Sequence, residues 1–162
     1  MKLLLTTIVA LLLLTSTAFG DKVLNEENIT KVLDNVKIAK EHRNLKALKK
    51  NFLSRTSVSI TEQNIESSDT NRYSFSEYIR HLSKKWKSLK SNLIEVQDRK
   101  FNIDPNGKSA LVKTTLSQTL EKNGVKTATI IYETTGIKLI KGKVYINYYS
   151  ARIMLNTAIR VN

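Results

Sequence analysis

The sequence predicts an α+β domain in which about three helices cover one face of a strongly curved antiparallel sheet. Two observations predict this fold. The segment Asn92–Leu155 divides into four long runs rich in Val, Ile, Thr and Tyr, separated by turns that contain Gly. Upstream of it, apolar residues recur at helical spacing in three segments. Helices followed by a series of strands are typical of an α+β domain.

The first twenty residues have the pattern of a secretory signal peptide. Lys2 precedes the apolar run Leu3–Leu14, and Ala18-Phe19-Gly20 puts small residues three and one before a cleavage point. The apolar run is shorter than the roughly twenty residues that span a bilayer, and no later segment is apolar enough. We therefore predict a signal peptide at 1–20, a single domain at 21–162, and an exported protein, periplasmic or secreted, without a transmembrane segment after cleavage.

Composition narrows the classes of function. The absence of Cys excludes disulfides, thiolate catalysis and the lipid anchor of a bacterial lipoprotein. The formal net charge of +13 favours attraction to anionic surfaces such as lipid headgroups, polyanionic glycans or acidic proteins. A core must hold the domain together, and a chain of this length is sufficient for one.

The N-terminal half contains two helices, a strand and a loop. Ile, Leu and Val at helical spacing predict a helix over Asn25–Arg43, and Asn44 is expected to cap a shorter helix that ends at Lys50. Alternating residues predict a strand at Ser57–Glu62. The polar segment Gln63–Arg72 lacks periodicity, so we expect an exposed loop.

A third helix is expected to begin at Ser74, which forms a capping box with Glu77. Its apolar stripe consists of Phe75, Tyr78, Ile79, Leu82, Trp86 and Leu89. Its opposite face and the second helix are basic. A solvated surface is the simpler interpretation, and a docking site for an anionic surface is the alternative; its candidate residues are Lys46, Lys49, Lys50, Arg80, Lys84 and Lys87.

The four predicted strands are Asn92–Ile103, Ser109–Glu121, Lys126–Leu139 and Lys143–Leu155. In the last strand, alternation places apolar residues on both faces: Val144, Ile146, Tyr148 and Met154 on one, and Tyr145, Tyr149, Ile153 and Leu155 on the other. Such a strand packs on both sides or meets a second subunit. Gly136, inside the third strand, predicts a bulge or bend.

Three stretches resemble the nuclear-transport-factor-2-like superfamily, which includes SnoaL-like and ketosteroid-isomerase-like proteins. They are Glu41-His42-Arg43-Asn44-Leu45-Lys46-Ala47-Leu48, Phe52-Leu53 followed by Val58-Ser59-Ile60, and Gly107-Lys108-Ser109-Ala110-Leu111-Val112 with Ile140-Lys141-Gly142-Lys143-Val144-Tyr145-Ile146. The resemblance covers nearly all of Asn25–Leu155.

The resemblance implies a cone: a curved sheet around helices, with a cavity at the open end. Members of the superfamily include isomerases, dehydratases, cyclases, subunits that only bind, and dimeric scaffolds. Isomerase-like members place a carboxylate just after the first strand and hold an oxyanion with an acid and a tyrosine. This sequence departs from the family because Val144 replaces a tryptophan and Tyr148-Tyr149-Ser150 replaces the usual histidines.

The catalytic candidates are Glu62, Glu133 and Tyr132. Glu62 is nearest to the family's carboxylate position, although an exposed glutamate at a strand end is the simpler interpretation. Glu133 is a pocket acid if Ile131 faces inward. It faces solvent or a partner if Tyr132 faces inward, which the alternation of the strand favours. The ligand-pocket candidates are Tyr78, Trp86, Tyr132 and Tyr148.

Several functions lack the residues they need. His42 and His81 are the only histidines and form no metal-ligand pair, so no metal site is predicted. The serine-hydrolase turn, the phosphate-binding loop and the dinucleotide fingerprint are absent. We therefore predict no cofactor and no nucleic-acid partner.

Two hypotheses remain. The first is an exported, non-catalytic binding or assembly module, with a cone cavity for a small apolar ligand or an outer sheet face for a protein partner. That face, with Tyr145, Tyr149 and Ile153, suits a homodimer. The second is a SnoaL-like, cofactor-independent isomerase or hydratase that uses a cavity carboxylate and a tyrosine.

Overall fold

The computed structural model describes residues 23–161, with side chains up to residue 155. The predicted signal peptide at 1–20 therefore lies outside the described residues. The described helices are α2 (Glu26–Glu41), α3 (Leu45–Lys49) and α4 (Phe75–Trp86). The strands are β1 (Phe52–Gln63), β2 (Ser68–Ser74), β3 (Ser91–Ile103), β4 (Ser109–Lys122), β5 (Val125–Ile140) and β6 (Lys143–Val161).

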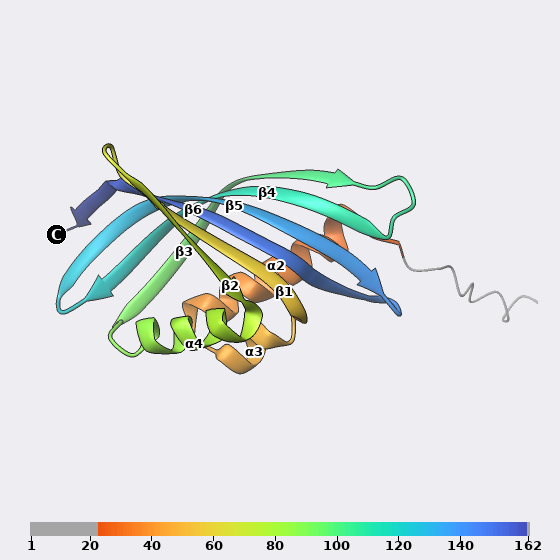
Figure 1. Ribbon diagram of the computed structural model, residues 1–162, viewed down its shortest axis with the longest axis horizontal. Helices are drawn as coiled ribbons and strands as arrows, with labels where there is room; N and C mark the ends of the chain where they lie inside the picture. The colour runs from red at the N-terminus through yellow and green to blue at the C-terminus, as the bar shows by residue number, and fades with distance from the viewer. Residues whose placement is uncertain (1–22, 162) are drawn as a thin grey trace, which may run out of the picture.

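All six strands belong to one open sheet in the order β2-β1-β6-β5-β4-β3. The sheet arches over the described helices, which lie on its concave side (Figure 1). The predicted α+β fold is confirmed. The sheet is mixed rather than purely antiparallel, because β1 and β6 run parallel. No local hairpin pattern signals this pair, since the whole meander separates the two strands in sequence.

The helix caps predicted at Asn44 and Ser74 form, and the structure adds a third cap at Asn25. The side chain of Asn25 accepts a hydrogen bond from the backbone N–H of Asn28 at the start of α2, and Asn44 caps α3. Ser74 and Glu77 form a reciprocal capping box at the start of α4. These side chains satisfy backbone N–H groups that have no partner within a helix, and they fix where each helix begins.

The turns of the meander also match the prediction. Gly107, Gly124 and Gly142 all have positive φ angles, of 65°, 77° and 73°. Asn123 and Lys141 precede two of these glycines with φ of 52° and 49°, as two-residue hairpin turns require. Each turn joins neighbouring antiparallel strands, so local turn chemistry sets their register next to the turn.

The prediction of an exposed loop over Gln63–Arg72 is wrong for most of this segment. β2 begins at Ser68 and pairs antiparallel with β1, and the hydroxyls of Thr61 and Thr70 lie 2.9 Å apart across the pair. Nearly every residue of β2 is exposed. A strand without a buried face shows no apolar alternation, so periodicity gave no sign of it.

A bulge interrupts β6. Gly136 of β5 pairs with Tyr148, whereas the next residue of β5, Ile137, pairs with Ile146. Asn147 is therefore an extra residue on β6. The bend that Gly136 predicts is confirmed at this shift, where a Cβ on Gly136 would lie 3.0 Å from the Cβ of Tyr148.

The bulge reverses which residues of β6 face the helices. Ile146 is buried before the bulge, and Tyr149 is buried after it. The predicted grouping of Tyr148 with Ile146 is wrong, and so is the outward placement of Tyr149 and Ile153. One inserted residue exchanges the two faces of a strand. The apolar residues on both faces of β6 therefore need no second subunit to explain them.

The core lies between the helices and the concave face of the sheet. α2 contributes Ile29, Leu33 and Val36, and the predicted stripe of α4 is buried as expected. The rings of Phe52, at the start of β1, and Phe75, at the start of α4, stack with centroids 4.9 Å apart. This packing holds α4 against β1, near the edge of the sheet that β2 forms.

Candidate functional site

A cavity of about 70 Å³ lies between α4 and the concave face of the sheet. This volume is several times the roughly 10–15 Å³ that one water needs. Most of the lining is apolar: Ile60, Leu82, Trp86, Leu89, Ile94, Leu116, Leu120, Ile131, Ala151 and Ile153. Concave, mainly apolar sites with a few convergent polar groups are typical of ligand-binding sites.

A polar cluster forms part of the wall of this cavity. Lys40 Nζ donates hydrogen bonds to Glu133 Oε1 and to Tyr149 Oη, each at 2.8 Å. Tyr149 Oη donates to the same Oε1 of Glu133. Tyr78 shares a side-chain hydrogen bond with Tyr149, and their ring centroids lie 5.9 Å apart. We call these four residues the polar cluster; they come from α2, β5, β6 and α4.

Burial dominates the electrostatics of the polar cluster. Burial by itself lowers the pKa of Lys40. The charge of Glu133 and smaller favourable contributions together outweigh burial, so the pKa of Lys40 lies above its usual 10.5. Burial, and then the charge of Glu133, raises the pKa of Tyr149 well above 10.0. Burial also raises the pKa of Tyr78, against the charge of Lys40. Near neutral pH the cluster therefore holds an ammonium and two uncharged phenols.

The backbone around Lys40 is fixed by neighbouring side chains. Asn92 Nδ2 donates to the carbonyl oxygen of Lys40 at 2.9 Å, and Gln118 Nε2 donates to Asn92 Oδ1 at 2.8 Å. The backbone N–H of Ile94 donates to Glu41 Oε1 at 3.0 Å, which joins the end of α2 to β3. These contacts fix the end of α2, from which the Lys40 side chain extends to Glu133 and Tyr149.

The polar cluster separates the cavity from a second, smaller one of about 20 Å³. Lys40, Glu133 and Tyr149 line both spaces. The guanidinium of Arg99 lines the smaller space and pairs with Asp34 at 2.7 Å. The cluster therefore forms a wall across the interior.

Glu133 lies inside the fold, against the orientation that the alternation favoured. Its side chain is 11% exposed and faces the cavity beside Ile131, whereas Tyr132 is 49% exposed. Tyr132 lines none of the cavities described above. It is not a pocket residue, because the register of β5 puts the odd-numbered residues Ile131, Glu133 and Thr135 on the inner face.

The other candidates divide between the cavity and the surface. Tyr78 and Trp86 line the cavity as predicted. Tyr148 is 38% exposed and lies outside the cavity, because the bulge at Asn147 turns it outward. Glu62 is exposed and lies near the end of β1, which agrees with the simpler interpretation of an exposed glutamate at a strand end.

Sequence reasoning missed Lys40 and misplaced Tyr149. A signal for Lys40 was present, because it continues the helical spacing of Ile29, Leu33 and Val36 on the buried face of α2. A lysine on an apolar stripe is rarely buried unless it is paired. Tyr149 had no comparable signal, since its direction depends on the bulge.

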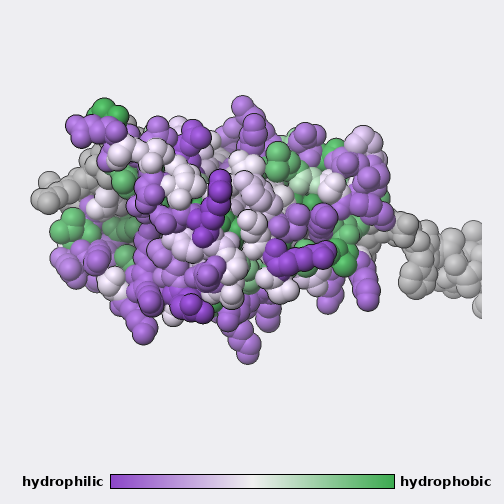
Figure 2. Space-filling model, in the orientation of Figure 1, coloured by the Kyte–Doolittle hydropathy of each residue, from purple (hydrophilic) through white to green (hydrophobic). Residues whose placement is uncertain are grey.

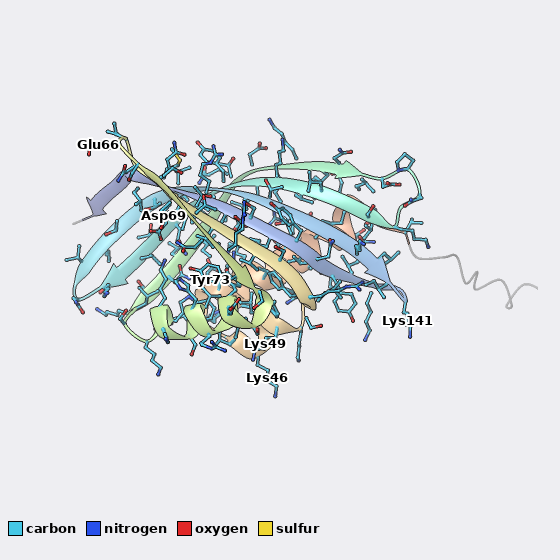
Figure 3. All side chains as sticks on the ribbon, viewed as in Figure 1. Lys46, Lys49, Glu66, Asp69, Tyr73 and Lys141 are labelled. Carbon is cyan, nitrogen blue, oxygen red and sulfur yellow. The ribbon has the colours of Figure 1, made fainter. Side chains whose placement is uncertain are left out.

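The basic candidates Lys46, Lys49, Lys50, Arg80, Lys84 and Lys87 are all exposed. Lys46 and Lys49 project from α3, away from the sheet (Figure 3). The face drawn in Figure 2 is mostly hydrophilic, with scattered apolar patches. Anionic-surface binding by these residues stays a prediction.

The described part of the chain contains neither a cluster of metal ligands nor a helix that could span a membrane. Within residues 23–161, no three His, Asp or Glu side chains gather in a way that suits a metal ion. No helix of the same segment is long and apolar enough to cross a membrane.

No protein-family model and no curated protein matches the sequence. Solved structures do match. A provisionally assigned aromatic ring hydroxylase from Novosphingobium aromaticivorans has a TM-score of 0.68 at 9% identity, over 83% of this chain and 92% of the other. Hexachlorocyclohexane dehydrochlorinase LinA-type3 from Novosphingobium barchaimii has a TM-score of 0.63 at 9% identity, over 83% of this chain and 88% of the other. An NTF2-like protein from Cytophaga hutchinsonii gives 0.63 at 13% identity, over 80% and 98%.

Proposed function

We propose, from the premise that this chain has the nuclear-transport-factor-2-like fold, that it is a non-catalytic module whose cone cavity binds a small, mainly apolar molecule. The fold alone does not decide this, since the same fold carries many functions. What supports the proposal is the state of Glu133, the one carboxylate in the cavity lining. Its Oε1 already accepts hydrogen bonds from Lys40 and Tyr149.

A carboxylate held in this way is a poor starting point for catalysis. A general base must come within hydrogen-bond reach of the proton it removes. In the polar cluster, two donors of the protein already occupy Oε1, one of the two carboxylate oxygens of Glu133. The remaining lining is apolar and suits burial of a hydrocarbon body, which is worth about 25 cal/mol per Å² of apolar surface.

The test is direct because the protein has a single tryptophan, Trp86, which lines the cavity. Titration with octanol, a neutral probe, should change the emission of Trp86 and saturate. Ala151→Leu fills the cavity and should abolish the change. Ser150→Leu, on the outer side of the same strand, is the matched control and should retain it. Unchanged Trp86 emission in the wild-type protein would refute cavity binding.

A cofactor-independent isomerase or hydratase is the second candidate. The inward position of Glu133 beside Tyr78 and Tyr149 is the condition that this hypothesis needs. Isomerisation begins with removal of a proton next to a carbonyl, and so does dehydration, the reverse of the hydratase reaction. The test is proton–deuterium exchange of cyclohexanone in heavy water, followed by NMR. We expect exchange at the background rate; faster exchange that is lost in Glu133→Gln would favour the enzyme.

Assembly through the outer face of the sheet is a separate proposal. Leu111, Tyr132 and Tyr148 are exposed apolar side chains on β4, β5 and β6, and Tyr148 and Leu111 both flank Gly136 in register. A homodimer through this face should give twice the monomer mass in light scattering. A monomer at high concentration would contradict it.

A further inference from the structure

The mouth of the cavity is basic while its interior is apolar, and α4 supplies both properties. Leu82 and Trp86 point from α4 into the cavity and are buried. His81 and Lys85, one helical turn apart on the same helix, also line the cavity but are exposed. A ligand that enters past α4 therefore meets cationic or polar side chains first and hydrocarbon second.

The charge at the mouth is not compensated by the lining. Glu133 is the one acid among the lining residues, and it is paired with Lys40. Within residues 23–155, Lys85 has no ion pair with an acidic side chain. The cavity therefore has a neutral interior and a positive rim.

A second hollow extends this positive field. A groove of about 340 Å³ joins the mouth at His81 and is lined further by Arg72, Tyr73, Glu77, Arg80 and Lys84. Its single acid, Glu77, accepts hydrogen bonds from Ser74 in the capping box of α4. Clefts lined by one sign of charge attract ligands of the opposite sign.

We propose that the ligand is an amphiphilic anion: an apolar body in the cavity and an acidic head, a carboxylate or a phosphate, at the rim between His81 and Lys85. This inference rests on the proposed binding function and specifies the class of ligand. Lys85 and His81 are positioned to donate hydrogen bonds to the head. Leu82 and Trp86 contact the body one turn away on α4, so one helix recognises both ends.

The experiment compares three probes of equal chain length by their effect on Trp86 emission: octanoate, octyl phosphate and octanol. Because exposed ion pairs are weak, we expect the two anions to bind about three- to tenfold more tightly than octanol. That advantage should shrink as salt is added, since salt screens exposed charges. The stronger of the two anions identifies the head.

Variants locate the effect. Lys85→Gln should weaken the binding of octanoate about three- to fivefold and leave the binding of octanol unchanged. Lys87→Gln, an exposed lysine of the same region that lines none of the cavities described above, is the matched control and should change neither. Both side chains are at the surface, so neither change threatens the fold.

The outcomes separate the two proposals. If octanol binds as tightly as both anions, or if Lys85→Gln acts no more than Lys87→Gln, the anionic ligand is refuted while cavity binding stands. If none of the three probes alters Trp86 emission, cavity binding itself fails. Preference for an anion, lost in Lys85→Gln, supports both.

Discussion

Tyr148 and Tyr149 are neighbours on β6, and Tyr132 and Glu133 are neighbours on β5. In each pair the two side chains lie on opposite faces of the sheet. Tyr149 is 3% exposed and lies in the polar cluster with Glu133. Tyr148 and Tyr132 face outward and contribute to neither cavity. Residue type is the same for the tyrosines on both faces. What a residue does here is therefore set by the face it occupies, which depends on strand register.

The largest effect should come from changing that register. Deletion of Asn147 removes the bulge and keeps Tyr149 and Ala151 on the inner face, so we expect a folded protein. Deletion of Ser150 turns Ala151 outward and Arg152 inward, opposite Glu133, where it adds a second cation to a carboxylate that already pairs with Lys40. A buried unpaired charge costs several kcal/mol, so this deletion should prevent folding. Circular dichroism and gel filtration distinguish the two; equal folding of both deletions would contradict the bulge.

Next in size is the loss of charge from the inner face. Glu133→Gln leaves Lys40 buried beside a neutral side chain, and we expect the free energy of unfolding in urea to fall by about 3 kcal/mol. The double change Lys40→Met with Glu133→Leu should recover most of that loss, because it removes both charges. Glu62→Gln, at an exposed position, should stay within about 0.5 kcal/mol of wild type. An equal effect at Glu62 and Glu133 would contradict the assignment of faces.

The two neighbouring tyrosines give the sharpest comparison. Tyr149→Phe removes a hydroxyl that donates to Glu133 and accepts from Lys40, so it should lower the free energy of unfolding by about 1–3 kcal/mol. Tyr148→Phe removes an exposed hydroxyl and should change it by less than about 0.5 kcal/mol. Both are measured by urea denaturation, and a larger loss for Tyr148→Phe would reverse the comparison.

The smallest effect is a pH dependence to which the buried groups of the inner face should contribute. The folded pKa of Tyr149, Tyr78 and Lys40 each lies above its unfolded value of 10.0 or 10.5. Above about pH 10 the folded chain therefore binds more protons than the unfolded chain, and stability must fall as pH rises. Below that pH these three groups leave stability unchanged.

Urea denaturation between about pH 8 and pH 11 measures this slope. Tyr149→Phe should flatten it because one titrating group is removed from the interior. Tyr148→Phe, its neighbour on the outer face, should leave the slope as in the wild type. Stability that is constant through this range would contradict the burial of the cluster.

Much of the fold was predictable because its signals are local. The caps at Asn44 and Ser74 and the turns at Gly124 and Gly142 act within a few residues of themselves, and all appear where the sequence places them. β2 was missed because an exposed polar strand depends on pairing with β1, not on its own pattern. The parallel pairing of β1 with β6 was missed for a similar reason.

The candidate site was predictable only in part. Tyr78 and Trp86 follow from the helical stripe of α4, which needs no knowledge of its neighbours. Glu133 was a candidate, but the alternation of its strand favoured the wrong face. Lys40 was not a candidate, although it lies at helical spacing from Val36 and Leu33 on α2. These residues meet because four separate elements converge on one wall.

By itself, the sequence determined the helices, the turns of the meander and the order of every element except β2, since each of these depends on contacts between residues close in the chain. The tertiary structure decided which side of the sheet each residue of β6 faces, because the insertion of Asn147 is defined only against its partner β5. It also decided the charge pairing of Lys40 with Glu133, whose positions lie 93 residues apart.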